Sequence, residues 1–185
     1  MRGYLLSIWT AVDPVYFKFS RLRYPTNDFK IDNILRVRLT RYKGKNVTLA
    51  DGITINKHDT LVKIHLHNVR LLNELKDVKS NIIKGKIIFK YVSKSLPELE
   101  KYIQNHPKSN EIKGIIGITF LNKGCGRLGF EVMHIHHPVY RRFKWAGCLL
   151  IGALSSNPSI KKLIKKPAPS YLFMSKNKLT QMYQK

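Results

Sequence analysis

The sequence predicts an α+β fold, in which a small, mostly antiparallel sheet is packed by two or more helices and followed by a basic C-terminal appendage. Two stretches, 34–42 and 61–67, alternate apolar and polar residues, as strands with one buried face do. Asp51-Gly52 between them marks a tight hairpin turn. Helical patterns at 68–105 and two further apolar strands complete the order expected of this class.

The segment before the sheet is expected to form two short apolar or amphipathic helices, 4–12 and 15–22. Asp13-Pro14 separates them, because proline interrupts helical hydrogen bonding. A loop at 24–28 follows from composition. The sheet then takes its strands from four stretches, 34–42, 47–49, 53–55 and 61–67.

Two helices are expected after the sheet. Asn68 is a suitable N-cap for the first, which Gly85 can interrupt. Ser95-Leu96-Pro97-Glu98 has the form of a capping box and predicts the start of a second helix ending near Asn105. Strands at 112–121 and 130–136 follow, joined by a glycine-rich turn or short helix.

The character of the chain changes at Pro138, so we expect a folded domain at 1–137 and a basic, partly apolar appendage at 138–185. The apolar run 145–154 is shorter than the roughly 20 residues that a membrane span needs. The N-terminal apolar run stops at Asp13-Pro14 without a signal-cleavage pattern, so a cytoplasmic protein is expected. The two cysteines provide no disulfide framework.

Charge is the most informative property of the composition. There are 34 lysines and arginines against 11 acidic residues, a formal net charge of +23, and the last acidic residue is Glu131. Such an excess attracts polyanions and opposes self-association. The partner is therefore expected to be anionic, and no catalytic signature names a reaction.

Basic side chains share one face of each main strand. Alternation places Arg36 and Arg38 on one side of 34–42, and Lys63, His65 and His67 on one side of 61–67. If the strands belong to one sheet, this face suits phosphate or carboxylate groups, because arginine offers a planar fork of donors. A solvated outer face of an antiparallel sheet gives the same pattern.

Two His-x-His pairs allow a metal site. His65 with His67, and His134 with His136, each point two imidazoles to one side of a predicted strand. Neighbouring strands would then supply three or four nitrogen ligands for zinc. The sequence contains no HExxH motif, and plain anion contacts explain the same histidines. Zinc is the one cofactor that the pattern permits, and none is required.

The C-terminal segment is a candidate for contact with a membrane surface. A tryptophan and basic residues flank an apolar run too short to span, which is typical of an interfacial segment on an anionic leaflet. A last core helix followed by a solvated tail is the alternative. The flanking residues are Arg141, Arg142, Lys144, Trp145, Lys161, Lys162, Lys165 and Lys166.

Several stretches together resemble the YkoP-like family, an uncharacterised group from Gram-positive bacteria. They are 4–9 with Asp13-Pro14, 36–44, Asp51-Gly52 leading to 62–68, 117–119 and 128–130, and they span about residues 1–136. Similar domains accompany polysaccharide deacetylase domains, which implies work near envelope polysaccharide. Deacetylase motifs are not visible in this sequence, so that activity is not carried over. The resemblance marks His65 and Asn68 as signature positions.

The functional hypothesis is an anion-binding protein without catalysis. It would act at the inner membrane face or on anionic polysaccharide or lipid precursors of the envelope, through Arg36, Arg38, Lys63, His65, His67 and Asn68. One alternative is a histidine-ligated metal-dependent hydrolase or transferase of envelope polysaccharide metabolism. Another is a nucleic-acid binder, for which charge alone supports only nonspecific, salt-sensitive contact.

Overall fold

A computed structural model describes residues 2–25, 33–119, 123–135, 138–142, 145 and 168–184, and of residues 2–9 the backbone alone. The elements in chain order are α1 (Arg2–Phe19), β1 (Leu35–Arg41), β2 (Val47–Thr48), β3 (Thr54–Ile55), β4 (Thr60–Leu66), α2 (Asn68–Leu75), α3 (Asn81–Gln104), η1 (Ser109–Glu111), β5 (Ile112–Thr119), η2 (Cys125–Leu128), β6 (Glu131–His134), β7 (Ser170–Ser175) and α6 (Lys176–Tyr183).

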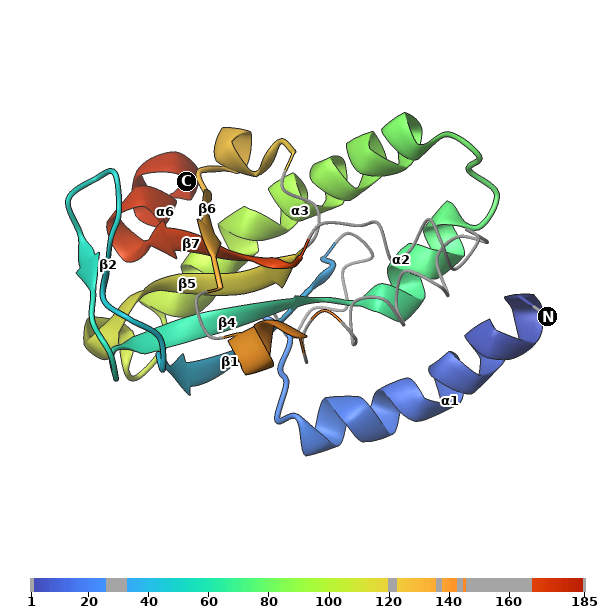
Figure 1. Ribbon diagram of the computed structural model, residues 1–185, viewed down its shortest axis with the longest axis horizontal. Coiled ribbons are helices and arrows are strands. Elements are labelled where there is room, and N and C mark those ends of the chain that lie inside the picture. Colours follow the sequence, from blue (N-terminus) through green and yellow to red (C-terminus); the bar gives the residue numbers. More distant parts are fainter. Residues whose placement is uncertain are drawn as a thin grey trace.

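Five strands form one sheet in the order β1-β4-β5-β7-β6, and β2 with β3 forms a separate hairpin (Figure 1). Only the β4–β5 pair is parallel; the β1–β4, β5–β7 and β7–β6 pairs are antiparallel. A parallel pair needs a long crossover, and α2 and α3 provide it. The predicted α+β class is confirmed, as are the strands at 34–42 and 61–67 and the Asp51-Gly52 hairpin.

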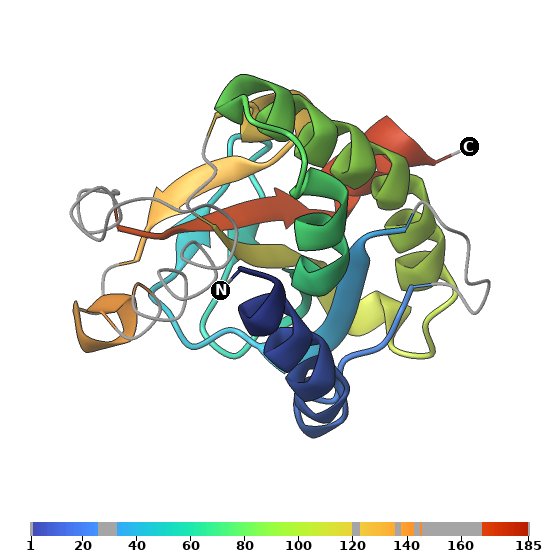
Figure 2. The same cartoon turned by 90° about the vertical axis from the view of Figure 1, so that its right-hand side faces the viewer.

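The two faces of the sheet carry different layers. On one face, α3 and α6 cover a core that includes Val37, Val62, Ile115 and Met174. On the other face, the β2–β3 hairpin packs a second cluster around Phe173. Figures 1 and 2 show α1 on the side of the sheet opposite to α3. The basic face of β1 and β4 is therefore partly covered, whereas the sequence pattern left it open to solvent.

The N-terminal segment is one helix, where two were predicted. α1 runs 18 residues and contains Pro14. Proline removes one N–H from the hydrogen-bond ladder, so the helix loses a single bond there. It ends in a Schellman-type turn: Arg21 adopts a positive φ of 51°, and the Leu22 N–H bonds the Phe17 carbonyl at 3.2 Å.

The helix starts after β4 also differ from the prediction. The N-cap of α2 is His67, without a side-chain cap bond, and Asn68 is the first helical residue. α3 is continuous through Gly85 and Pro97 and is capped by Ser80, which accepts a bond from the Ile83 N–H. The predicted cap Ser95 is buried inside α3.

Ser95 has a different partner from the one that its local motif suggests. Its hydroxyl donates to the Tyr91 carbonyl and accepts a 3.0 Å bond from the Ile34 N–H, which lies 61 residues away in sequence. The serine therefore joins α3 to the start of the sheet. A contact of this range leaves no trace in a four-residue motif.

The predicted boundary at residue 137 is wrong for the part of 138–185 that the structure describes. β7 lies inside the sheet between β5 and β6, and Phe173 and Met174 are almost completely buried. α6 follows directly and buries Leu179 in the main core. Residues 168–184 thus belong to the folded domain, while 146–167 lie outside the described residues.

Within the part of the chain that the structure describes, none of the helices combines the length and the apolar character needed to cross a bilayer.

Candidate functional site

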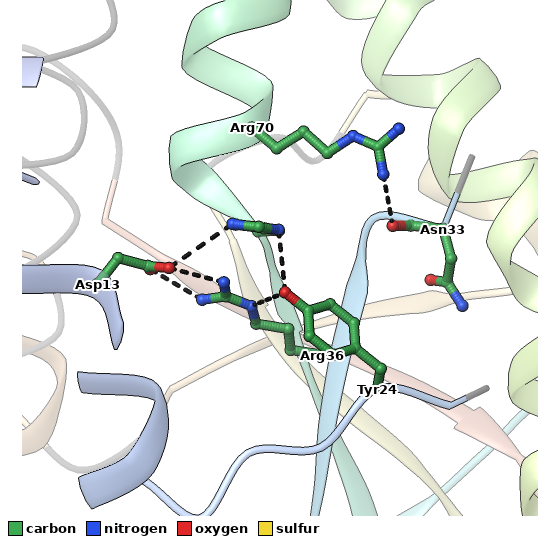
Figure 3. A network of polar contacts seen from close by, with 6 residues as sticks. Asp13, Tyr24, Asn33, Arg36 and Arg70 are labelled. Carbon is green, nitrogen blue, oxygen red and sulfur yellow. Dashed lines mark hydrogen bonds and ion pairs between the residues drawn. The ribbon is translucent and has the colours of Figure 1, made fainter. Parts of the chain in front are cut away.

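A polar cluster joins α1 to the basic face of the sheet, and Figure 3 shows it from close by. Asp13 of α1 forms a two-pronged ion pair with Arg36 of β1, with Nη1–Oδ1 at 2.8 Å and Nη2–Oδ2 at 2.6 Å. The side chains of Asp13 and Arg36 are only 11% and 6% exposed. Two parallel hydrogen bonds of this kind hold the two side chains in one relative orientation and add to the attraction between their charges.

Aromatic rings enclose the guanidinium of Arg36. Its central carbon lies 4.9 Å from the ring centre of Phe17 and 5.5 Å from that of Tyr24. Those two rings stack on each other at 5.4 Å. Cation–π contacts of this kind hold a charged group that has little access to water.

Tyr24 and His67 extend the cluster to the end of β4. The Tyr24 hydroxyl accepts a 3.0 Å bond from Arg36 Nε and lies 3.3 Å from His67 Nδ1. His67 Nε2 lies 3.6 Å from Asp13 Oδ2. One proton arrangement satisfies these contacts: the Tyr24 hydroxyl donates to Nδ1, and a neutral His67 directs its Nε2–H toward Asp13.

The electrostatics agree with a neutral histidine. Burial lowers the pKa of His67 to about 4; the positive charge of Arg36 acts in the same direction, and Asp13 only partly opposes it. For Arg36, burial acts to lower the pKa, but the hydrogen bonds with Asp13 and Tyr24 outweigh it and raise the pKa. Arg36 is thus a permanent cation with its counter-charge in place.

Arg38 lies on the same face as Arg36 and has different surroundings. It is half-buried, and its Nη1 donates to the Ser20 carbonyl at the end of α1 at 3.3 Å. Among the described residues, Arg38 has no ion pair with a carboxylate, and its Nε has no hydrogen-bond partner. The positive charge of Arg38 also reaches Tyr140, whose pKa burial raises and Arg38 lowers.

The strand register sets basic residues opposite one another. Arg38 of β1 pairs with Lys63 of β4, and Arg36 pairs with His65. Lys63 and His65 are half-buried. Like charges directly opposite on antiparallel strands repel each other. The register therefore brings two cationic side chains, Arg38 and Lys63, side by side on this face, where Arg38 lies near Ser20 and Tyr140.

The structure separates the predicted anion-binding residues into two groups. Arg36 and His67 belong to the cluster with Asp13, and the Arg36 donors are engaged inside the protein. Arg38, Lys63 and His65 form the adjoining part of the face. Asn68 is half-buried at the first turn of α2.

The predicted histidine metal site draws on two strands that are not neighbours. His65 is on β4 and His134 on β6, and β5 and β7 lie between them. No group of three or more His, Cys, Asp or Glu side chains arranged to hold a metal occurs among the described residues. His136 lies outside those residues, so the full predicted set is not described.

Of the predicted membrane-surface residues, Arg141 and Arg142 are exposed and Trp145 is half-buried. Together with Ala168 they line a shallow hollow of about 130 Å³. Lys144, Lys161, Lys162, Lys165 and Lys166 lie outside the described residues.

Sequence reasoning missed Asp13 and Tyr24 as parts of a site. Asp13 was assigned to a helix break and Tyr24 to a loop, because Pro14 and Pro25 follow them. One signal was present: Asp13 is the single acidic residue among residues 2–25 of a strongly basic chain. An isolated carboxylate in such a segment favours an internal cationic partner.

Comparison with known proteins gives the family. The model of the YkoP domain matches residues 2–183, and the chain is 52% identical over 186 residues to the uncharacterized protein YkoP of Bacillus subtilis (strain 168), covering 100% of this chain and 99% of that protein. No solved structure matches the chain. The chain therefore belongs to the YkoP domain family, and the match includes the C-terminal strand and helix.

Proposed function

We propose that the protein binds a phosphate- or carboxylate-bearing ligand at Arg38 and Lys63, on the sheet face between α1 and the helical turn at 138–142. One observation carries this proposal. Two half-buried cations face each other across β1 and β4, and Arg38 has no carboxylate partner among the described residues. Two residues away, Arg36 has such a partner.

A bound anion would supply a counter-charge to Arg38, which has no carboxylate partner among the described residues. An anion between Arg38 and Lys63 replaces a repulsive pair by two attractive contacts, and a half-buried position makes such contacts stronger than in water. Arginine binds the oxygens of phosphate or carboxylate through paired donors, and lysine contributes a point charge. His65, opposite Arg36 in the register, lies on the same face beside this pair.

Arg36 and His67 have a positioning role in this proposal. Arg36 cannot turn its donors to a ligand without leaving the Asp13 carboxylate buried and unpaired, which is costly. The cluster instead fixes α1 against β1, and α1 in turn holds Arg38 through the Ser20 carbonyl. The ligand-contacting set proposed here is therefore Arg38, Lys63 and His65.

The chemistry of the ligand follows from charge. A net charge of +23 concentrates anionic molecules around the protein. Phosphate and carboxylate groups are shared by anionic lipids and by anionic polysaccharide or lipid precursors of the envelope, and we propose the inner membrane face as the place of action. The metal-enzyme and nucleic-acid alternatives stay predictions of the sequence, because no observation among the described residues favours either.

The test is a calorimetric titration with two soluble probes, inorganic pyrophosphate for phosphate and polygalacturonate for carboxylate. Arg38→Gln is compared with Arg41→Gln, which removes the same charge from the same strand. Arg41 is exposed, and strand alternation places it on the opposite face of the sheet from Arg38. Losing a charged hydrogen bond costs about 1.5–3 kcal/mol, so Arg38→Gln should weaken binding of the preferred probe by roughly 10- to 150-fold.

The Arg41→Gln control should weaken binding by less than about twofold, because an exposed rim charge contributes little. Equal loss in both variants would mean that net charge alone drives binding and would contradict a built site at Arg38. If Arg38→Gln loses affinity for pyrophosphate, the ligand group is a phosphate; if it loses affinity for polygalacturonate, the group is a carboxylate.

A further inference from the structure

The helix α1 turns an apolar stripe to solvent and a carboxylate toward the sheet. Its half-buried positions on the sheet side are Asp13, Phe17 and Ser20. Its exposed positions form an apolar stripe, which we define as Val12, Val15, Tyr16 and Phe19, with exposures of 47%, 68%, 46% and 89%. A surface helix of a soluble protein normally turns such a stripe to the core.

The spacing of the stripe shows that it is one continuous surface. Positions 12, 15, 16 and 19 follow the i, i+3, i+4, i+7 pattern that lines up along one side of a helix. In the sequence, Leu5, Ile8 and Trp9 continue the same spacing toward the N-terminus. The stripe is therefore a patterned feature, because scattered exposed apolar residues would not repeat at this period.

Apart from Asp13, the charged residues of the segment that carries the stripe are all basic. Residues 2–25 contain a single acidic residue, Asp13, and Arg36 neutralises it on the sheet side of the helix. Lys18, Arg21 and Arg23 are exposed on the same segment. The outer surface of this segment thus combines apolar side chains with positive charge and carries no carboxylate.

We infer that α1 is an interfacial helix, which docks this stripe onto a bilayer containing anionic lipid. An apolar stripe bordered by lysine and arginine is the pattern of a helix lying in the plane of the headgroups. Each basic residue near an anionic leaflet contributes through attraction to the negative surface potential. A second copy of the chain is the less suitable occupant, because two molecules of charge +23 repel each other.

The Asp13–Arg36 ion pair is the anchor that makes this presentation possible. It fixes the polar side of α1 to β1 at two oxygens, so the apolar stripe is held outward and already helical. Docking by α1 does not depend on the proposed anion site at Arg38, which faces the other side of the helix through the Ser20 carbonyl. The two proposals can therefore fail separately.

The experiment is co-sedimentation of the full-length protein with vesicles of phosphatidylcholine alone and with 30% phosphatidylglycerol. We expect binding to the anionic vesicles, and at least a tenfold weaker partition for Val15→Ser/Phe19→Ser. The matched control is Ile82→Ser/Ile83→Ser, which removes two exposed apolar side chains from the N-terminal end of α3. It should retain binding within about twofold.

Because both pairs of residues are exposed, the variants should keep their fold, and circular dichroism with urea unfolding checks this directly. Arg38→Gln is run in the same assay and should keep vesicle binding while losing affinity for the soluble probe. Loss of vesicle binding in Arg38→Gln with full binding in Val15→Ser/Phe19→Ser would overturn docking by α1 and leave the anion site standing.

Three other results would also overturn the inference. One is absence of binding to either vesicle. Another is equal loss in the stripe variant and the α3 control. The third is a dimer in analytical ultracentrifugation that dissociates in Val15→Ser/Phe19→Ser without any vesicle binding, which would make a second copy the occupant.

Discussion

Arg36 and Arg38 lie on the same face of the same strand, two residues apart, and differ in what covers them. Arg36 meets the carboxylate of Asp13 and is enclosed by Phe17 and Tyr24. Arg38 donates to the Ser20 carbonyl, has no carboxylate partner among the described residues and lies opposite Lys63. One arginine is part of the internal support of the fold, and the other is the residue through which we propose that a ligand binds.

Residue type and strand position do not by themselves assign a role to an arginine. An arginine whose donors are all engaged by a buried carboxylate contributes to the fold, and its removal leaves that carboxylate without a partner. An arginine with an unfilled donor near a like charge is electrostatically strained and gains from an added anion. The position of α1 decides between the two.

The largest expected effect comes from removing Arg36. Arg36→Met leaves Asp13 buried with neutral His67 beside it and without a cationic partner, so the free energy of unfolding in urea should fall by about 3–5 kcal/mol. Arg38→Met, the same change on the same face, should cost much less. In Asp13→Leu/Arg36→Met much of the loss should return, because neither charge is then left buried. If Arg36→Met and Arg38→Met lowered the free energy of unfolding equally, the claim that Arg36 alone of the two supports the fold would be wrong.

His67 makes the stability of the cluster around Arg36 sensitive to acid. Its pKa in the folded protein is about 4, against 6.5 for the ordinary side chain. Between these values the unfolded state binds more protons, so stability is greatest above pH 6.5 and falls as the pH is lowered toward 4. The loss should be on the order of 2–3 kcal/mol.

Urea unfolding at pH 7, 6, 5 and 4 measures this loss for the wild type and for His67→Gln, which should be much less dependent on pH. The matched control is His134→Gln, at an exposed histidine of β6, which should follow the wild type. If His67→Gln keeps the full pH dependence, the acid sensitivity belongs to other groups.

A smaller effect is expected from the Tyr24 hydroxyl, which links Arg36 to His67. Tyr24→Phe keeps the ring beside Phe17 and removes the oxygen that accepts from Arg36 Nε. Stability should fall by about 1.5 kcal/mol, the lower end of the range for a hydrogen bond to a charged group, because Tyr24 is only half-buried. Urea unfolding measures this loss. The control Tyr16→Phe removes a hydroxyl from an exposed residue of α1 and should leave the free energy of unfolding unchanged.

The smallest effect on the free protein is expected at Arg38. Arg38→Gln should change the free energy of unfolding by less than about 0.5 kcal/mol, since relief of repulsion offsets the lost contact to Ser20. Addition of the bound probe at 100 times its dissociation constant should stabilise the wild type by about 2.7 kcal/mol. The Arg38→Gln variant should gain far less, and a gain equal to that of the wild type would place the ligand elsewhere.

The strands of the basic face were predictable because their signals are local. Alternation over 34–42 and 61–67 identifies β1 and β4 and gives the correct partition of side chains between two faces. Asp51-Gly52 identifies the hairpin, and Gly52 has the positive φ of 81° that the turn requires. The family resemblance read from short stretches is also confirmed.

β7 was not predictable from the same kind of signal. Its residues are buried on both faces, so Ser170–Ser175 shows an apolar run without alternation, just after a basic, proline-containing stretch. Its partners on β5 lie 51 to 61 residues earlier in the chain, from Thr119 opposite Ser170 to Gly114 opposite Ser175. The local pattern therefore placed β7 in an appendage, although it lies between β5 and β6 in the sheet.

The net charge and the strands that carry the basic side chains could be read from the sequence alone. The tertiary structure was needed to show which of those basic side chains already has a carboxylate partner inside the protein. Alternation fixes the side of the sheet to which Arg36 and Arg38 point, but it carries no information about what covers that side. Asp13 reaches Arg36 across 23 residues of chain, and the docking of α1 places its carboxylate over one arginine and leaves the next without it.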